Sequence, residues 1–255
     1  MGKLINIGSL CIDRVYKVPK IATQGETVTS TSWATFSGGK GLNQSIAAAK
    51  AGATVEHVGC VGLDGDSLIA ELGKAGISSR FVNVGAAPSG HAVIQVDEDG
   101  RNSIVISAGA NRELDSGLIQ DAILRLEEAD WLLLQNETNG IADAIELAAQ
   151  EGKKVAINIA PADERMFDYP LSKVALIVVN ELEAMALSSK PSPQLAFDWL
   201  INAYPEIDIV LTLGEEGVWF YRARDSARKG MGSFNIDAKD ETAAGAVSYT
   251  HLTLP

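Results

Sequence analysis

A glycine-rich loop, Gly38-Gly39-Lys40-Gly41, is the stretch of this sequence best suited to binding a ligand. Three glycines in four positions let the backbone turn sharply and approach a ligand closely. The small residues that follow predict a helix ending at Gly52. Its N-terminus would suit hydroxyls or anions, with Lys40 and Asn43 placed to hydrogen-bond them. The alternative is an ordinary glycine turn before a core helix.

Polar side chains also follow several apolar runs, at the points where predicted strands end. They are Asp13, Glu137, Asn158, Asn180, Glu183 and Thr212. The carboxyl ends of parallel strands meet at one edge of a sheet, where open α/β sheets bind their ligands. We therefore expect these groups to converge on a site. Singly, each could be a cap or a turn residue, and the position of Asp13 taken alone favours that interpretation.

A third candidate is the run of small residues that follows Asp240, namely Glu241-Thr242-Ala243-Ala244-Gly245-Ala246. Successive backbone N–H groups in such a run can form a nest that holds an anion. An anion hole of this kind would suit a phosphoryl group in transit.

The elements that must position these groups alternate between strand and helix. Short apolar runs predict buried strands at 4–8, 54–61, 131–135, 155–159, 174–179 and 207–213. Helices are expected at 64–75, 114–128 and 141–149. The repeated order of strand, polar residues and helix predicts a parallel sheet with helices on both faces.

Further strands are predicted outside this alternation. Residues 15–18 and 26–32 are rich in β-branched side chains. Asp99-Gly100 between the alternating runs 91–97 and 101–107 predicts a hairpin. These strands could form a small sheet of their own.

Composition narrows the function classes. The 255 residues, 46% of them hydrophobic, suffice for one large α/β domain. A net charge of −12 without any Lys/Arg-rich run argues against nucleic acid or an anionic membrane as the main partner. Two cysteines and the absence of a signal peptide's apolar core favour the cytoplasm. The three histidines have no metal-ligand spacing, and His57 and His91 are predicted to be strand residues.

Other nucleotide-binding and hydrolase motifs are missing. The sequence has no Gly-x-Gly-x-x-Gly after its first strand, which argues against a nicotinamide-dependent oxidoreductase. It also lacks a Gly-x-x-x-x-Gly-Lys-Ser/Thr loop and a Gly-x-Ser-x-Gly elbow.

Taken together, the motifs resemble those of the ribokinase-like (PfkB-type) family of carbohydrate kinases over essentially residues 4–245. The resemblance is carried by Gly8-Ser9 with Asp13, Gly25-Glu26-Thr27-Val28, Gly38-Gly39-Lys40-Gly41 with Asn43-Gln44, Gly52, Gly62, Ala108-Gly109-Ala110-Asn111, Glu137, Asn158 with Ala160-Pro161-Ala162, Asn180 with Glu183, and Thr212-Leu213-Gly214 with Gly217-Val218-Trp219.

The resemblance implies a three-layer Rossmann-like α/β domain over residues 1–246, with a small β lid from about 12–36 and 91–107 and a homodimer formed through the lid. It implies transfer of the γ-phosphoryl of ATP to a primary hydroxyl of a small sugar, such as ribose or a related pentose. Mg²⁺ and an activating monovalent cation, K⁺ or another, are implied as well.

Site roles follow from the same resemblance. The sugar would be held by Asp13, Gly39, Lys40, Asn43 and Glu137, and ATP would lie along Asn180, Thr212, Gly214, Glu215 and Gly217. Glu183 would lie near Mg²⁺ and its waters, Asp240 and Thr242 at the monovalent cation, and Ala243, Ala244 and Gly245 in the anion hole.

The sequence departs from the family pattern at several positions. Ala246 stands where the family carries the Asp that acts as base, and Glu241 where Thr is usual. Cys11 stands where an Asn that touches the sugar is usual. Residues 247–255 fit neither helix nor strand, and we expect a non-native tail there in place of closing helices.

Two hypotheses therefore stay open. The chain is expected to be a sugar kinase impaired by the loss of its base. The alternative is a non-catalytic sugar-binding or regulatory protein of the same fold, or a family kinase for a nucleoside or hexose.

Overall fold

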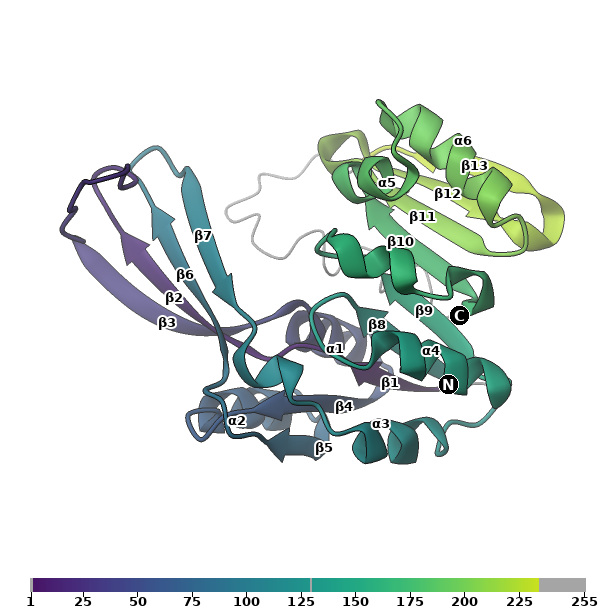
Figure 1. Ribbon diagram of the computed structural model, residues 1–255, viewed down its shortest axis with the longest axis horizontal. Helices are drawn as coiled ribbons and strands as arrows, with labels where there is room; N and C mark the ends of the chain where they lie inside the picture. The colour runs from purple at the N-terminus through teal and green to yellow at the C-terminus, as the bar shows by residue number, and fades with distance from the viewer. Residues whose placement is uncertain (1, 129, 234–255) are drawn as a thin grey trace.

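The computed structural model describes residues 2–128 and 130–233, and its main body is a nine-stranded sheet (Figure 1). The strand order is β13-β12-β11-β10-β9-β8-β1-β4-β5. All pairs from β11 to β5 are parallel, whereas β12 and β13 extend the β11 edge in antiparallel fashion. The strands are β1 (Lys3–Ile7), β4 (Thr54–Val61), β5 (Ser78–Val84), β8 (Trp131–Gln135), β9 (Lys154–Asn158), β10 (Leu176–Asn180), β11 (Asp208–Thr212), β12 (Val218–Arg222) and β13 (Ala227–Met231).

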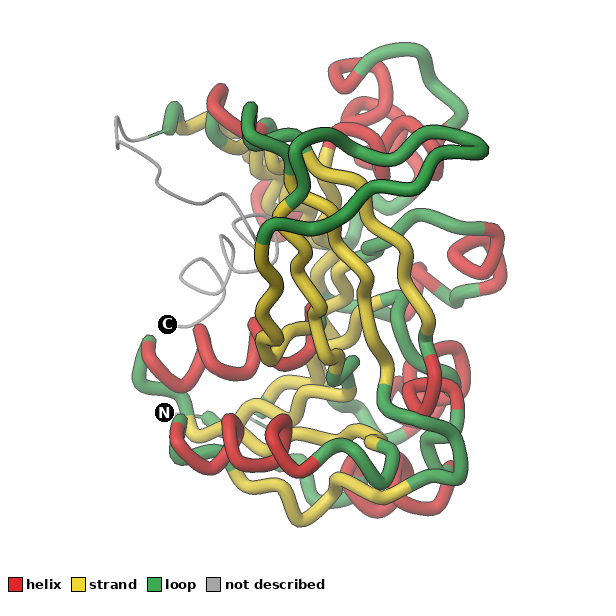
Figure 2. Tube along the Cα trace, turned by 90° about the vertical axis from the view of Figure 1, so that its left-hand side faces the viewer, coloured by secondary structure: helices red, strands yellow, loops and turns green. Residues whose placement is uncertain are grey.

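Helices cover both faces of this sheet (Figure 2). Successive side chains of a strand point to opposite faces, and in β1 this alternation separates two apolar clusters. Leu4 packs in the cluster that contains Leu42 and Leu68, while Ile5 packs in the cluster that contains Ile145. One face therefore carries α1 (Lys40–Lys50) and α2 (Asp66–Lys74), and the other carries α3 (Ser116–Ile123), α4 (Ile141–Gln150), α5 (Glu181–Ser188) and α6 (Pro193–Ala203). Among the described helices, none is long and apolar enough to cross a bilayer.

A second sheet of four strands projects from the main body (Figures 1 and 2). Its order is β3-β2-β6-β7, with β2 and β6 parallel and the outer pairs antiparallel. The bounds are β2 (Cys11–Lys17), β3 (Ser32–Gly38), β6 (Gly90–Val96) and β7 (Asn102–Ser107). The predicted fold class, a three-layer α/β domain with a small additional sheet, is confirmed.

The strand predicted at 26–32 is wrong. Regular pairing on β2 ends where Lys17 faces Ser32, and the chain before Ser32 has no strand to pair with. Pro19, two residues beyond Lys17, has no backbone N–H to extend the ladder. The β-branched residues of this segment thus favour a strand that the topology does not accommodate.

Candidate active site

A cleft of about 530 Å³ lies between the second sheet and the carboxyl edge of the main sheet. It brings together nine of the residues that the sequence predicts for a site. They are Asp13, Gly39, Lys40, Asn43, Glu137, Asn158, Asn180, Glu183 and Thr212. The apolar side chains of Ala92, Ile94, Ile104 and Ile106, from β6 and β7, line the same cleft.

Other predicted site residues lie elsewhere. Gly214, Glu215 and Gly217 belong to the turn between β11 and β12 and do not line the cleft. The predicted cation, anion-hole and base positions, Asp240, Thr242, Ala243, Ala244, Gly245 and Ala246, lie outside the described residues.

The glycine loop places the start of α1 against the turn between β1 and β2. Gly39 is the N-cap of α1 and has φ 99°, a conformation that L side chains rarely adopt. A Cβ atom at Gly38 would overlap the carboxylate of Asp13, and one at Gly41 would overlap the backbone of Gly8 and Ser9. The glycines therefore permit close packing, and α1 begins directly in the cleft.

Glu137 connects this helix start with the end of β8. Its Oε1 accepts from Lys40 Nζ at 3.1 Å, and its Oε2 accepts from the backbone N–H of Lys40 at 3.0 Å. The hydroxyl of Ser9 also donates to Oε2. These three donors fix the orientation of the Glu137 carboxylate. The ion pair with Glu137 in turn holds the ammonium group of Lys40 at a fixed position in the cleft.

Asp13 faces the same end of the cleft from β2. Its pKa is raised to about 6, chiefly by burial and also by the nearby Glu137 carboxylate, against an opposing effect of Lys40. The protonation state of Asp13 therefore changes close to neutral pH.

At the far end of the cleft, Asn180 and Glu183 form a reciprocal cap on α5. The side chain of Asn180 accepts from the Glu183 N–H at 2.8 Å, and the Glu183 carboxylate accepts from the Asn180 N–H at 2.8 Å. The pKa of Glu183 is raised to about 7 by burial, although the hydrogen bond from the Asn180 N–H and the charge of Lys40 both act to lower it. A nearby cation would relieve this burial of negative charge.

The donor set at this end suits Mg²⁺. Asn180, Glu183 and Thr212 offer oxygen atoms, and Mg²⁺ is usually held by one or two carboxylates together with substrate phosphates. The described part of the chain has no cluster of three or more His, Cys, Asp or Glu side chains suited to a metal ion. One carboxylate and a phosphate-bearing ligand therefore match the residues present.

A chain of buried amides supports the floor of the cleft. Asn158 Oδ1 accepts from Gln44 Nε2 at 3.3 Å, Gln44 Oε1 accepts from Gln135 Nε2 at 2.7 Å, and Gln135 Nε2 also donates to Asn6 Oδ1 at 2.8 Å. Asn6 Nδ2 donates in turn to Ser45 Oγ at 2.8 Å. These side chains order α1 against the strands that flank it.

His57 lies in β4 and His91 in β6, as predicted. The ring of His57 is buried and lies 2.8 Å from Ser45 Oγ and 3.2 Å from the Gly8 carbonyl oxygen. Burial lowers its pKa to about 4. His57 is thus a neutral structural residue at physiological pH.

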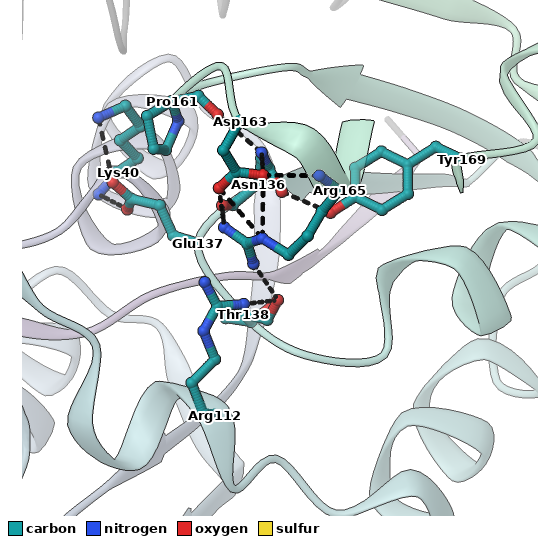
Figure 3. Close-up of polar contacts among 9 residues, drawn as sticks. All are labelled: Lys40, Arg112, Asn136, Glu137, Thr138, Pro161, Asp163, Arg165 and Tyr169. Atoms are coloured by element: carbon teal, nitrogen blue, oxygen red, sulfur yellow. Dashed lines mark hydrogen bonds and ion pairs between the residues drawn. The ribbon is translucent and has the colours of Figure 1, made fainter. Parts of the chain in front are cut away.

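Four polar residues of the cleft were not predicted, namely Arg112, Asn136, Asp163 and Arg165. Asn136 directly precedes Glu137, and Asp163 directly follows the Ala160-Pro161-Ala162 motif. The sequence could have indicated these two residues only through their position beside motif residues. Figure 3 shows them grouped around the turn that carries Glu137.

Comparison with known proteins gives a consistent result. The family model described as pfkB family carbohydrate kinase matches residues 1–245. A ribokinase of Haemophilus influenzae is 34% identical over 253 residues, which cover 94% of this chain and 80% of that protein. The crystal structure of a ribokinase from Thermotoga maritima has a TM-score of 0.83 at 30% identity, over 98% of this chain and 84% of that one.

A third relative has a bound nucleotide. The crystal structure of a ribokinase from Cryptococcus neoformans var. grubii serotype A in complex with ADP has a TM-score of 0.83 at 26% identity. The match covers 98% of this chain and 86% of that one.

Proposed function

Because the chain belongs to the pfkB family of carbohydrate kinases, we propose that its acceptor is ribose or a closely related pentose, phosphorylated on a primary hydroxyl. As a member of this family, the chain is an ATP-dependent carbohydrate kinase. The proposal on the acceptor is supported by the ribokinases among its relatives. The observation that carries it is the convergence of Asp13, Lys40 and Glu137 at one end of the cleft.

These three side chains suit a small polyhydroxylated ligand. The carboxylates of Asp13 and Glu137 would accept hydrogen bonds from sugar hydroxyls, and Lys40 and Asn43 would donate to sugar oxygens. Gly39 would let the backbone approach the sugar without a side chain in between. The apolar residues of β6 and β7 would cover the sugar and exclude water.

ATP would occupy the other end of the cleft. Asn180 and Thr212 end β10 and β11, and β11 lies three strands from β8, roughly 14 Å away at the usual strand spacing. We assign Asn180, Thr212, Gly214, Glu215 and Gly217 to the nucleotide and Glu183 to Mg²⁺ through water. Mg²⁺, when bound, neutralises charge on the transferring phosphates.

The remaining assignments concern positions outside the described residues. We propose that Ala243, Ala244 and Gly245 form the anion hole, that Asp240 and Thr242 hold K⁺ or another monovalent cation, and that residues 1–246 form one kinase domain. Ala246 occupies the position of the base that would take the proton of the attacking hydroxyl. Loss of a general base costs about 10²–10⁴-fold in rate, so we expect slow turnover.

Sugar-dependent ADP release tests this proposal. It would be measured for the chain and for A246D over a panel of pentoses, hexoses and nucleosides, with Mg²⁺ and with K⁺ present or absent. We expect A246D to be faster by about 10²-fold or more with ribose or a related pentose. Equal rates for both proteins would overturn the assignment of position 246.

The second candidate is a non-catalytic sugar-binding protein of the same fold. It is favoured by one observation: Asp13, Lys40, Asn43 and Glu137 are present on the sugar side while position 246 is Ala. Sugar binding without turnover in both proteins would support it. Preference for a nucleoside or a hexose would instead assign the chain to another kinase of the family.

A further inference from the structure

Two arginines that the proposed function does not use hold the turn that carries Glu137. This residue follows β8 in a turn, where neither strand nor helix fixes its backbone. Arg165 donates from Nη2 to the carbonyl oxygen of Asn136 at 2.8 Å and from Nη1 to that of Thr138 at 3.4 Å. Arg112 Nη1 donates to the same Thr138 oxygen at 2.8 Å. The carbonyl groups on both sides of Glu137 are therefore held by guanidinium groups (Figure 3).

Arg165 is itself held in place. Its Nε lies 3.0 Å from Asp163 Oδ1 and its Nη2 lies 2.5 Å from Asp163 Oδ2. Asn136 Nδ2 donates to the Pro161 carbonyl oxygen at 2.7 Å and to Asp163 Oδ1 at 3.0 Å, and the hydroxyl of Tyr169 donates to Asn136 Oδ1. The segment after β9 is thus fastened to the turn after β8.

The charge of Arg165 is balanced by the Asp163 carboxylate, so its influence on Glu137 is geometric rather than electrostatic. Arg165 has five N–H donors in one plane, and here they reach two carbonyl oxygens and a carboxylate. A lysine has the charge but not this fork, and it could not make the same set of bonds.

From this geometry we infer that Arg165 is a positioning residue of the sugar site, which orients Glu137 by holding the carbonyl groups of Asn136 and Thr138. The inference rests on the proposed function, in which Glu137 binds the sugar. Glu137 also fixes Lys40 through two hydrogen bonds. Rotation of Glu137 would therefore disturb two sugar-binding groups together.

Calorimetric titration of sugar and, separately, of ADP into the wild-type chain, R165M and R165K tests the inference without requiring turnover. We expect R165M to weaken the binding of ribose, or of the best pentose of the panel, by about 10- to 100-fold, because several charge-assisted hydrogen bonds are lost. ADP affinity should stay within about 2-fold, and R165K should recover part of the loss. Arg80, which pairs with Glu56 outside the cleft, provides the matched control R80M, which should bind sugar as the wild type does.

Several results would overturn the inference. One such result is that R165M binds sugar as tightly as the wild type does. Another is that R165M loses sugar affinity and ADP affinity equally, which is the effect expected when a purely structural residue is replaced. If R165M does not fold, R165K and R165Q carry the same comparison, and wild-type sugar affinity in both would likewise refute the role. Failure of the wild-type chain to bind any sugar of the panel would refute the proposed function, which is a separate result.

Discussion

Asp13 is the residue whose protonation should govern sugar binding. Its pKa is raised to about 6, chiefly by burial, so the carboxyl group is largely ionised at pH 8 and largely protonated at pH 5. The ionised form accepts hydrogen bonds from two hydroxyls, whereas the protonated form must donate one of its bonds. Sugar affinity should therefore rise with pH through this range.

We predict that the affinity for the preferred pentose falls about tenfold for each pH unit below 6 and is level above pH 7. Calorimetric titration of the sugar from pH 5 to 8 measures this pH dependence. Nucleotide is left out, because Glu183 at the nucleotide end of the cleft has its pKa raised to about 7 and would change its protonation in the same range. The variant D13N should bind weakly, with little dependence on pH. If the sugar affinity of D13N still depended steeply on pH, the titrating group would be a residue other than Asp13.

The same pKa shift has a consequence for stability. The folded-state pKa of Asp13 lies above its ordinary value of 3.8, so ionisation is harder in the folded protein than in the unfolded chain. The resulting destabilisation begins as pH rises above about 4 and is complete above about 6. D13N should therefore gain thermal stability relative to wild type at pH 8 and show no such gain at pH 4, as measured by thermal unfolding. A gain at pH 4 alone would contradict the sign of the shift.

At the scale of elements, the glycine loop couples β3 and α1 to Asp13. A Cβ at Gly38 would overlap the Asp13 carboxylate, so G38A should displace that side chain. We expect a destabilisation of about 1–3 kcal/mol, typical of overpacking, together with weaker sugar binding. Denaturant unfolding and calorimetry measure the two effects.

Gly73 offers the matched control for this substitution. It lies inside α2, and apart from its neighbours in the chain and the helix's own backbone a Cβ there would meet no atom within 4 Å. G73A should stabilise the chain by about 0.5–1 kcal/mol, because alanine favours the helix. If G38A were as stable as the wild type, or gained stability as G73A is expected to, the predicted clash with Asp13 would be refuted.

The central strands could be predicted from sequence because their runs are apolar and buried on both faces. Residues 131–135, for example, form β8 with the predicted bounds. The two edge strands, β5 and β13, and β12 beside β13 were missed because most of their side chains are partly buried or exposed. In β5 and β13 polar residues also interrupt the apolar pattern. The predicted helix at 114–128 is shorter in the structure, where α3 spans Ser116–Ile123.

The candidate site was predictable only in part for a similar reason. Motif residues such as Lys40 and Glu137 could be chosen by type and position, although 97 positions separate them. Arg165 could not, because its partners are backbone carbonyl groups up to 29 positions away, and no side-chain pattern marks a carbonyl acceptor. Such contacts depend on how the segments after β8 and β9 meet in three dimensions.

At the scale of the whole molecule, the second sheet has exposed apolar side chains on one face. Phe36 faces Asp13 across β3 and β2, Asp13 faces Ala92 across β2 and β6, and Ala92 faces Ile106 across β6 and β7. Phe36 and Ile106 therefore lie on the face of the sheet that also lines the cleft. Phe36 is 56% exposed and Ile106 is 59% exposed. Exposed apolar patches of this kind mark interaction sites, and we propose a homodimer formed through this sheet, which would act as a lid.

F36E should convert such a dimer to monomer, because a carboxylate would be buried in the interface without a partner. Sedimentation velocity over a tenfold range of concentration measures the change. Leu63, which is 91% exposed and lies outside the second sheet, provides the control L63E, which should remain dimeric. A wild-type chain that is monomeric throughout, or an F36E variant that is still dimeric, would contradict the proposed interface.

Calorimetric titration of ribose and related pentoses into the wild-type chain, alongside D13N and R80M, tests directly whether Asp13, Lys40 and Glu137 form a sugar site. We predict saturable binding of one pentose per chain, a loss of about tenfold or more in affinity in D13N, and no change in R80M. Absence of binding for every sugar, or binding that D13N leaves intact, would contradict a sugar site built on Asp13, Lys40 and Glu137.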